Sequence, residues 1–202
     1  MANSAWGYGV PMISVVGDSF CVPYTMEITV KKRIQGFSKA HYDVFDSSGN
    51  LLLQIDGSVW KISKKRVMRD PTGIPLLTLK QTICNFGQSA KWRKVWTVHP
   101  GENSDDILFR VEERSPVQLK TRLDVFLPDN DNKKAGDFYV TGSFASLSFK
   151  AYKDKSPIAQ VHHSYSWGSF CKGRESFKVR VQPEVDYSFI MALLVILEEN
   201  EN

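Results

Sequence analysis

Two short runs of basic residues suggest a binding function. Each reads "KKR", and together they comprise Lys31, Lys32, Arg33, Lys64, Lys65 and Arg66. Clustered ammonium and guanidinium groups hold phosphate through charge-assisted hydrogen bonds, and basic clusters beside a membrane attract anionic phospholipid. Both runs are therefore candidate sites for a phosphoinositide headgroup. The alternative is that lysine keeps strand ends hydrated and protects sheet edges from pairing.

The sequence does not indicate a metal site. "DNDNKKAGD" opens at Asp129 as a calcium loop would, but an EF-hand needs an acid or amide, a glycine and a glutamate at its fifth, sixth and twelfth positions. Those positions hold Lys133, Lys134 and Val140. His162 and His163 are adjacent, so in a strand they face opposite sides and cannot share one ion. We expect a polar loop, no metal and no cofactor.

No catalytic motif is evident either. Cys21, Cys84 and Cys171 lie far apart without a C-x-x-C pair, which is typical of reduced intracellular thiols. The chain has no G-x-S-x-G, no Walker A motif and no G-x-G-x-x-G. A cysteine–histidine nucleophile pair stays open as an alternative, although nothing near the cysteines favours one. We therefore expect a protein that is not an enzyme.

Length and charge narrow the class of protein. The 202 residues suffice for one ordinary domain with a core, and the net charge of +4 is too small to suggest the basic stripe of a DNA-binding protein. The first residues lack a signal peptide, and Ala2 excludes the N-myristoylation signal. We expect a monomer without a transmembrane segment or a DNA partner, located in the cytoplasm, with the membrane periphery and the nucleus as alternatives.

The basic runs must be positioned by strands. In "TMEITVK" the apolar Met26, Ile28 and Val30 alternate with polar residues, which predicts a half-buried strand with Lys31 and Arg33 on its wet face. "LKTRLDVFL" (119–127) and "FKVRVQ" (177–182) alternate in the same way. Turn-forming segments such as "DSSGN" and "DPTG" separate the runs. The spacing predicts a mostly β protein, an antiparallel sandwich or barrel of about ten to twelve strands.

One segment departs from this pattern. Residues 189–197 are all apolar and are followed by Glu198 and Glu199. As a helix, 188–197 would rise about 15 Å, half of a bilayer core of about 30 Å, so it is too short to span. A helix that is apolar on all sides must be surrounded by protein. We expect a helix inside a closed barrel, starting near Pro183 and Asp186, with a packed central strand or membrane contact as alternatives.

The predicted core helix and the domain boundaries complete the layout. The helix residues expected in the core are Phe189, Ile190, Leu193, Leu194, Ile196 and Leu197. Residues 1–15 are rich in glycine, serine and asparagine and are predicted to form a flexible N-terminal arm. No low-complexity linker interrupts the rest, so residues 16–202 are expected to form a single domain.

Several separated segments resemble the plant LURP-one-related family. They are "FCVPYTMEITVKKR" (20–33), "LKTRLDVFL", "FKVRVQP" and "VDYSFIMALLVILEEN" (185–200), and the resemblance covers residues 15–200. It implies a tubby-like closed antiparallel β-barrel of about twelve strands enclosing a hydrophobic C-terminal α-helix. That fold is similar to tubby C-terminal domains and to phospholipid scramblases.

The resemblance also implies a class of function. Tubby domains bind phosphoinositides and can move from membrane to nucleus, scramblases move lipids between leaflets, and the plant family is linked to pathogen defence. We therefore expect a non-enzymatic binding or signalling protein, tethered to anionic phospholipid or phosphoinositide, with a partner protein that the sequence does not specify. Scramblase-like lipid handling and a nuclear, transcription-related regulator are the alternatives. The resemblance supplies no catalytic residues.

Overall fold

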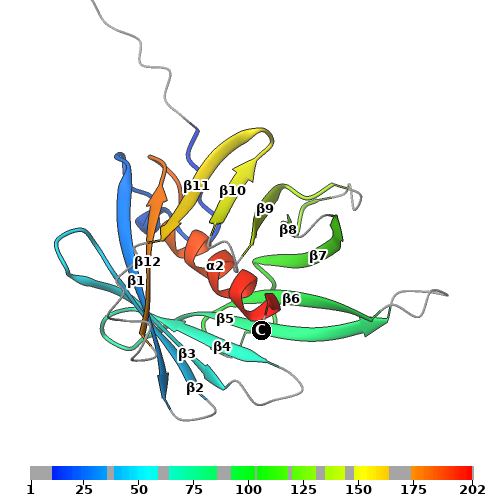
Figure 1. The fold of residues 1–202 in the computed structure, drawn as a ribbon, viewed down its shortest axis with the longest axis horizontal. Helices are drawn as coiled ribbons and strands as arrows, with labels where there is room; N and C mark the ends of the chain where they lie inside the picture. Colours follow the sequence, from blue (N-terminus) through cyan, green and yellow to red (C-terminus); the bar gives the residue numbers. More distant parts are fainter. Residues whose placement is uncertain are drawn as a thin grey trace, which may run out of the picture.

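The structure of the chain is a computed structural model that describes residues 11–35, 39–58, 64–85, 92–102, 104–117, 120–130, 135–143, 148–163 and 174–201. A short 3-10 helix, η1, and twelve strands precede one helix, α2 (Figure 1). The elements are η1 (Asp18–Phe20), β1 (Met26–Gln35), β2 (Lys39–Phe45), β3 (Leu51–Ser58), β4 (Lys65–Arg69), β5 (Pro75–Asn85), β6 (Trp92–Pro100), β7 (Phe109–Val117), β8 (Lys120–Phe126), β9 (Phe138–Ser143), β10 (Ser148–Lys153), β11 (Ser156–His163), β12 (Arg174–Val181) and α2 (Tyr187–Glu201).

The strands form a closed antiparallel barrel in which each strand pairs with its neighbours in the sequence. β1 closes the ring by pairing with β12, from Met26 opposite Val181 to Arg33 opposite Arg174. The predicted turns connect two of the hairpins, where Gly49 and Gly73 adopt φ of 86° and 91°. Those values favour glycine, as the "DSSGN" and "DPTG" segments indicated. The predicted mostly β class and closed barrel are confirmed.

Burial follows the predicted alternation along the strands. In β1, Ile28 and Val30 are each 1% exposed, whereas Lys31 and Arg33 are exposed. β8 differs from the prediction at one position. Asp124 belongs to the outer, predicted wet face, yet it is only 3% exposed. Two arginine side chains cover it, so the outer wall of the barrel contains a buried carboxylate.

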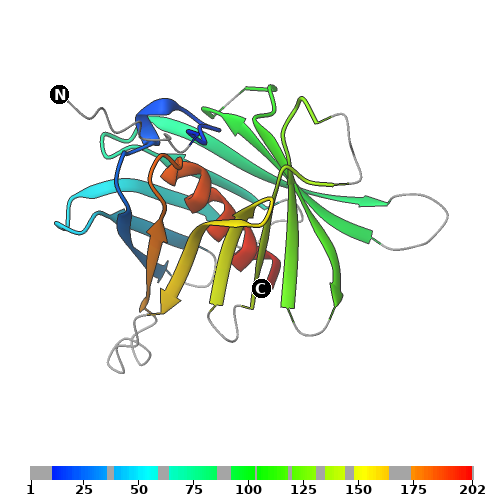
Figure 2. The ribbon, with the colours of Figure 1, turned by 90° about the horizontal axis from the view of Figure 1, so that it is seen from above.

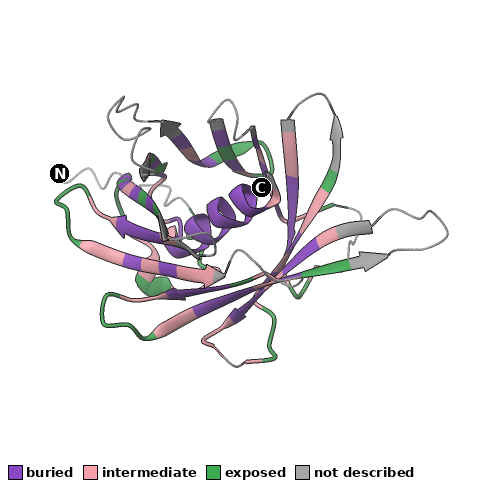
Figure 3. Cartoon of the chain, turned by 60° about the horizontal axis from the view of Figure 1, so that its bottom comes forward, coloured by how far each residue is buried: buried purple, intermediate pink, exposed green. Residues whose placement is uncertain are grey.

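The apolar run forms α2, which runs through the interior of the barrel (Figures 1 and 2). Figure 3 shows the helix buried along its length, and the six residues predicted for the core are at most 7% exposed. Phe189 makes edge contacts with Phe109 and Phe138, with ring centroids 5.0 and 5.1 Å apart. Among the described residues, no helix is both long enough and apolar enough to cross a membrane. The central-strand alternative for this run is wrong, because the wall closes without it.

Asp186 fixes the start of α2 and ties it to the N-terminal segment. Its Oδ1 accepts hydrogen bonds from the backbone N–H groups of Ser188 and Phe189, both at 3.0 Å, as a helix cap does. Its Oδ2 accepts from three consecutive N–H groups, those of Val15, Val16 and Gly17. One carboxylate therefore accepts hydrogen bonds from N–H groups at the start of the helix and from three N–H groups that line a backbone concavity. The helix start predicted at Asp186 is confirmed.

The N-terminal arm stays a prediction for residues 1–10, which lie outside the described residues. The described part of the predicted arm, 11–15, includes Ile13, which is 8% exposed and belongs to the hydrophobic core. Its backbone pairs with Val185, just before α2. At Ile13 the segment therefore packs on the barrel domain.

Candidate functional site

The inward-facing members of the two basic runs meet at the end of α2. Lys32, from β1, forms an ion pair with Glu198. Arg66, from β4, forms an ion pair with Glu199, and the Lys64 ammonium lies 3.2 Å from the same carboxylate. These cations lie at the C-terminal end of the helix, where the macrodipole and the exposed carbonyl groups favour positive charge. The two runs thus converge on adjacent residues of one helix.

The last turn of α2 is held by β6 as well. The indole Nε1 of Trp96 donates to the side-chain oxygen of Asn200 at 2.9 Å, and Lys94 Nζ donates to the Asn200 carbonyl at 3.1 Å. Lys64 also donates to the Glu199 carbonyl at 2.9 Å. The two lysine bonds satisfy helix-end carbonyls that have no partner within the helix, and the Trp96 bond holds the Asn200 side chain. Barrel side chains therefore cap the helix.

Tyr42 shows how strongly this end is shielded from water. Its side chain is 1% exposed, and burial, followed by the negative charges of Glu198 and Glu199, raises the pKa of its hydroxyl. The positive charge of Arg66 opposes that shift. Buried charges need partners, and here each carboxylate faces at least one cation. Lys32, Lys64 and Arg66 therefore help to hold the helix in the barrel.

The remaining members of the basic runs face outward. Lys31 lies over the Phe45 ring, with Nζ 4.7 Å from the ring centroid. Arg33 pairs with Asp43, a carboxylate that also contacts His41 Nε2 at 2.8 Å. Lys65 is exposed at the start of β4. The structure thus separates the six predicted residues into three directed at α2 and three directed at solvent.

Lys65 has a neighbour that the sequence reasoning missed. In the β4–β5 register it lies directly opposite Lys80, which is half-buried. Like charges in directly opposite positions repel. In the part of the chain that the structure describes, no carboxylate forms an ion pair with either lysine. The strand register brings these lysines together, and only the run containing Lys65 was visible in the sequence.

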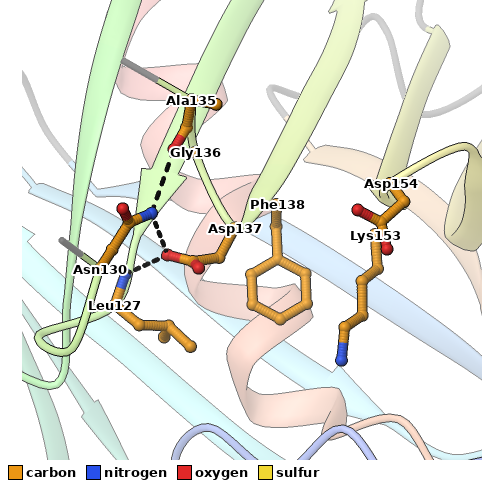
Figure 4. Close-up of a pocket in the computed structure, with 8 residues that line it drawn as sticks. All are labelled: Leu127, Asn130, Ala135, Gly136, Asp137, Phe138, Lys153 and Asp154. Atoms are coloured by element: carbon orange, nitrogen blue, oxygen red, sulfur yellow. Dashed lines mark hydrogen bonds between the residues drawn. The ribbon is translucent and has the colours of Figure 1, made fainter. Parts of the chain in front are cut away.

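The pocket shown in Figure 4 lies near the other end, where α2 begins. It has a volume of about 380 Å³ and is lined by Leu127, Asn130, Ala135, Gly136, Asp137, Phe138, Lys153 and Asp154. Asp137 Oδ2 accepts hydrogen bonds of 2.8 Å from the Leu127 N–H and from the Asn130 amide. The carboxylate therefore orders its own loop. Residues 131–134 of the predicted polar loop lie outside the described residues.

A metal site and a cysteine nucleophile are the two reactive groups in question, and of the three cysteines only Cys21 has a described side chain. No group of three or more histidine, cysteine or acidic side chains among them is arranged to hold a metal ion. Burial, and then the nearby Asp186 carboxylate, raises the pKa of the Cys21 thiol to about 11. A thiol is nucleophilic as its thiolate, so this environment disfavours the reactive form. The side chains of Cys84, Cys171, His162 and His163 lie outside the described part.

Comparison with known proteins gives consistent matches. The family model described as LURP-one-related matches residues 26–198, from the start of β1 to the last turns of α2. LURP-one-related 14 of Arabidopsis thaliana is 50% identical over 205 residues, covering 99% of this chain and 97% of that protein. LURP-one-related 9 of the same plant is 40% identical over 200 residues, covering 95% and 99%.

A solved structure agrees with the fold. An X-ray structure of a protein from Arabidopsis thaliana matches with a TM-score of 0.67 and 30% identity, covering 94% of this chain and 99% of that one. The family match therefore extends over the whole barrel and the helix inside it.

Proposed function

Because the chain belongs to the LURP-one-related family, whose model spans the barrel and its core helix, we propose that it is a non-enzymatic protein that docks on anionic phospholipid. Phosphoinositide headgroups are the proposed ligands. The docking surface consists of the outward-facing cations at the end of the barrel where α2 ends: Lys31, Arg33, Lys65 and Lys80. The role in plant defence that the family resemblance implies would make this protein a membrane-tethered regulator.

The Lys65–Lys80 pair gives the strongest support for this ligand. Two ammonium groups on directly opposite residues repel each other unless an anion lies between or above them. A phosphate group would remove that repulsion and gain charge-assisted hydrogen bonds. The barrel interior is filled by α2, so the outer wall is the surface on which this ligand would bind.

One alternative, lipid handling by α2, would require this helix to leave the barrel. The buried last turn of α2 is held by four barrel cations, so inserting this helix into lipid would break several buried ion pairs. Scramblase-like lipid handling through α2 is therefore disfavoured. Nothing in the described residues favours a nuclear role over a membrane role, and the membrane proposal rests on the outward-facing Lys65 and Lys80.

Vesicle flotation tests the proposal with outward-facing residues only. Vesicles of phosphatidylcholine with and without phosphatidylinositol bisphosphate would be compared for the wild type and the Lys65→Ala/Lys80→Ala double variant. A lysine near an anionic surface contributes about 1 kcal/mol, so the double variant should bind roughly 30-fold more weakly. Lys32, Lys64 and Arg66 are left unchanged because their loss would disturb α2.

The matched control is Lys153→Ala/Lys155→Ala. It removes the same charge from two exposed positions, the last residue of β10 and the turn that follows it, at the end where α2 begins. This control should float like the wild type. Equal weakening of vesicle binding in both double variants would show that only the net charge matters. Wild-type vesicle binding by the Lys65→Ala/Lys80→Ala variant would disprove the proposed surface.

A further inference from the structure

A buried carboxylate on the outer wall organises two arginines. Asp124 lies on the solvent side of β8, between Leu123 and Val125, which are fully buried in the core. Arg122 donates from Nε to Asp124 Oδ1 at 2.9 Å, and Arg114 Nε lies 3.1 Å from Oδ2. The two guanidinium groups therefore contact different oxygens of one carboxylate.

The two arginines share one carboxylate although they lie on directly opposite residues. Arg114 and Arg122 are directly opposite each other in the β7–β8 register, where like charges repel. Asp124 neutralises one of the two positive charges, and both arginine side chains remain about half exposed, at 54% and 43%. Both guanidinium groups are therefore accessible on the outer wall while Asp124 holds them.

Arg122 is further fixed by aromatic stacking. Its guanidinium carbon lies 4.6 Å from the centroid of the Tyr139 ring, in a cation–π contact. Tyr139 in turn stacks on Tyr152, with centroids 4.8 Å apart and ring planes 11° from parallel. A guanidinium held by a carboxylate and a ring loses little conformational entropy when it binds a ligand.

A third cation lies in the same row of the sheet. Arg122 is opposite Thr141 on β9, and Thr141 is opposite Lys150 on β10. Lys150 is exposed and lies two strands from Arg122, about 10 Å in backbone spacing, which its side chain can bridge. Arg114, Arg122 and Lys150 thus lie on one face of neighbouring strands, where they could together contact the oxygens of a phosphate monoester.

We propose that Arg114 and Arg122, positioned by Asp124 and supported by Lys150, form a phosphate-binding site on the outer wall of β7–β10. Guanidinium groups recognise phosphate through pairs of parallel N–H···O bonds, which a point charge cannot provide. The ligand class is a phosphate monoester, either free or on a lipid headgroup. This site is separate from the Lys65–Lys80 pair, so either proposal can be disproved while the other stands.

Titration calorimetry with inorganic phosphate and with soluble inositol trisphosphate tests whether the site binds phosphate and whether that phosphate is free or part of a headgroup. Arg122→Gln should weaken binding of both probes about tenfold or more, the effect of losing one or two charge-assisted hydrogen bonds. A clear preference for inositol trisphosphate would support a headgroup ligand, and similar affinities would support free phosphate. Both probes are titrated in the Lys65→Ala/Lys80→Ala background, so that the Arg114–Arg122 site is measured without the other proposed surface, and Arg122→Gln should weaken binding there as well.

Two further variants distinguish binding by positioned arginines from nonspecific electrostatic attraction of the phosphate. Asp124→Asn raises the local positive charge, so diffuse attraction would strengthen binding, whereas loss of arginine positioning should weaken it. Arg122→Lys keeps the charge at an exposed position and should also weaken binding, which covers the case in which Asp124→Asn unfolds.

The matched control is Arg180→Gln, an exposed arginine on β12 that pairs with Glu27 at 2.8 Å. It should bind as the wild type does. Stronger binding by a folded Asp124→Asn protein, equal losses in Arg180→Gln and Arg122→Gln, or no binding of either probe by the wild type would each overturn the proposal.

Discussion

At the scale of single residues, Arg66 reaches Glu199 because the neighbouring strand has no side chain in its path. Gly57 on β3 is opposite Arg66 on β4. A Cβ atom at position 57 would lie 2.4 Å from the Lys65 carbonyl oxygen, 2.5 Å from Arg66 Cδ and 2.7 Å from Arg66 Nη1. The glycine is therefore needed for space, and both backbone and side chain would have to move to admit a methyl group.

Gly57→Ala should destabilise the protein by roughly 2–4 kcal/mol, because it combines overpacking with disturbance of a buried ion pair. Chemical denaturation measures the change in the free energy of unfolding. Gly17→Ala is the matched control, since a Cβ there would make only ordinary contacts, the nearest at 3.5 Å from the Phe20 ring. A Gly57→Ala protein as stable as this control would show that Arg66 does not depend on the glycine.

At the scale of elements, α2 and the strands depend on each other. The helix supplies the centre of the core cluster, and barrel side chains satisfy its last turn. Since the helix is buried on all sides, it has no polar face with which to lie stably in water. The barrel and the helix should therefore fold together.

Leu194→Asp should prevent folding. Leu194 is 7% exposed, and an unpaired carboxylate there would cost several kcal/mol, a large part of the 5–15 kcal/mol typical of a domain's stability. The fraction of protein in the supernatant and its near-ultraviolet circular dichroism measure the effect, with Leu194→Met as the conservative control. Recovery of folded Leu194→Asp protein with native circular dichroism would contradict the proposed role of α2.

At the scale of the whole molecule, sequence periodicity predicted the strands, the core helix and the outward direction of Lys31 and Arg33. It could not predict that Lys32 and Arg66 end beside Glu198 and Glu199, because Arg66 and Glu199 are separated by 133 positions and meet only through barrel closure. The same limit applies to Lys80, which pairs with Lys65 only through the register of β4 and β5.

Asp124 shows a second limit of the sequence. Alternation assigned it to the wet face, and its face was predicted correctly. Its burial was not, because the cover comes from Arg114 on the adjacent strand and from Arg122 two residues earlier on its own. Side-chain cover on a solvent-facing wall depends on cross-strand neighbours, which periodicity alone does not identify.

We propose a division of labour in which the inward cations hold α2 in place while the outward cations bind anionic lipid. Hydrogen–deuterium exchange of the wild type, with and without vesicles containing phosphatidylinositol bisphosphate, tests both halves in one measurement. We predict that the vesicles slow exchange in β4 and β5 around Lys65 and Lys80, and that α2 stays the most slowly exchanging element in both samples. Faster exchange in α2 on vesicle binding, or no protection in β4 and β5, would contradict the claim.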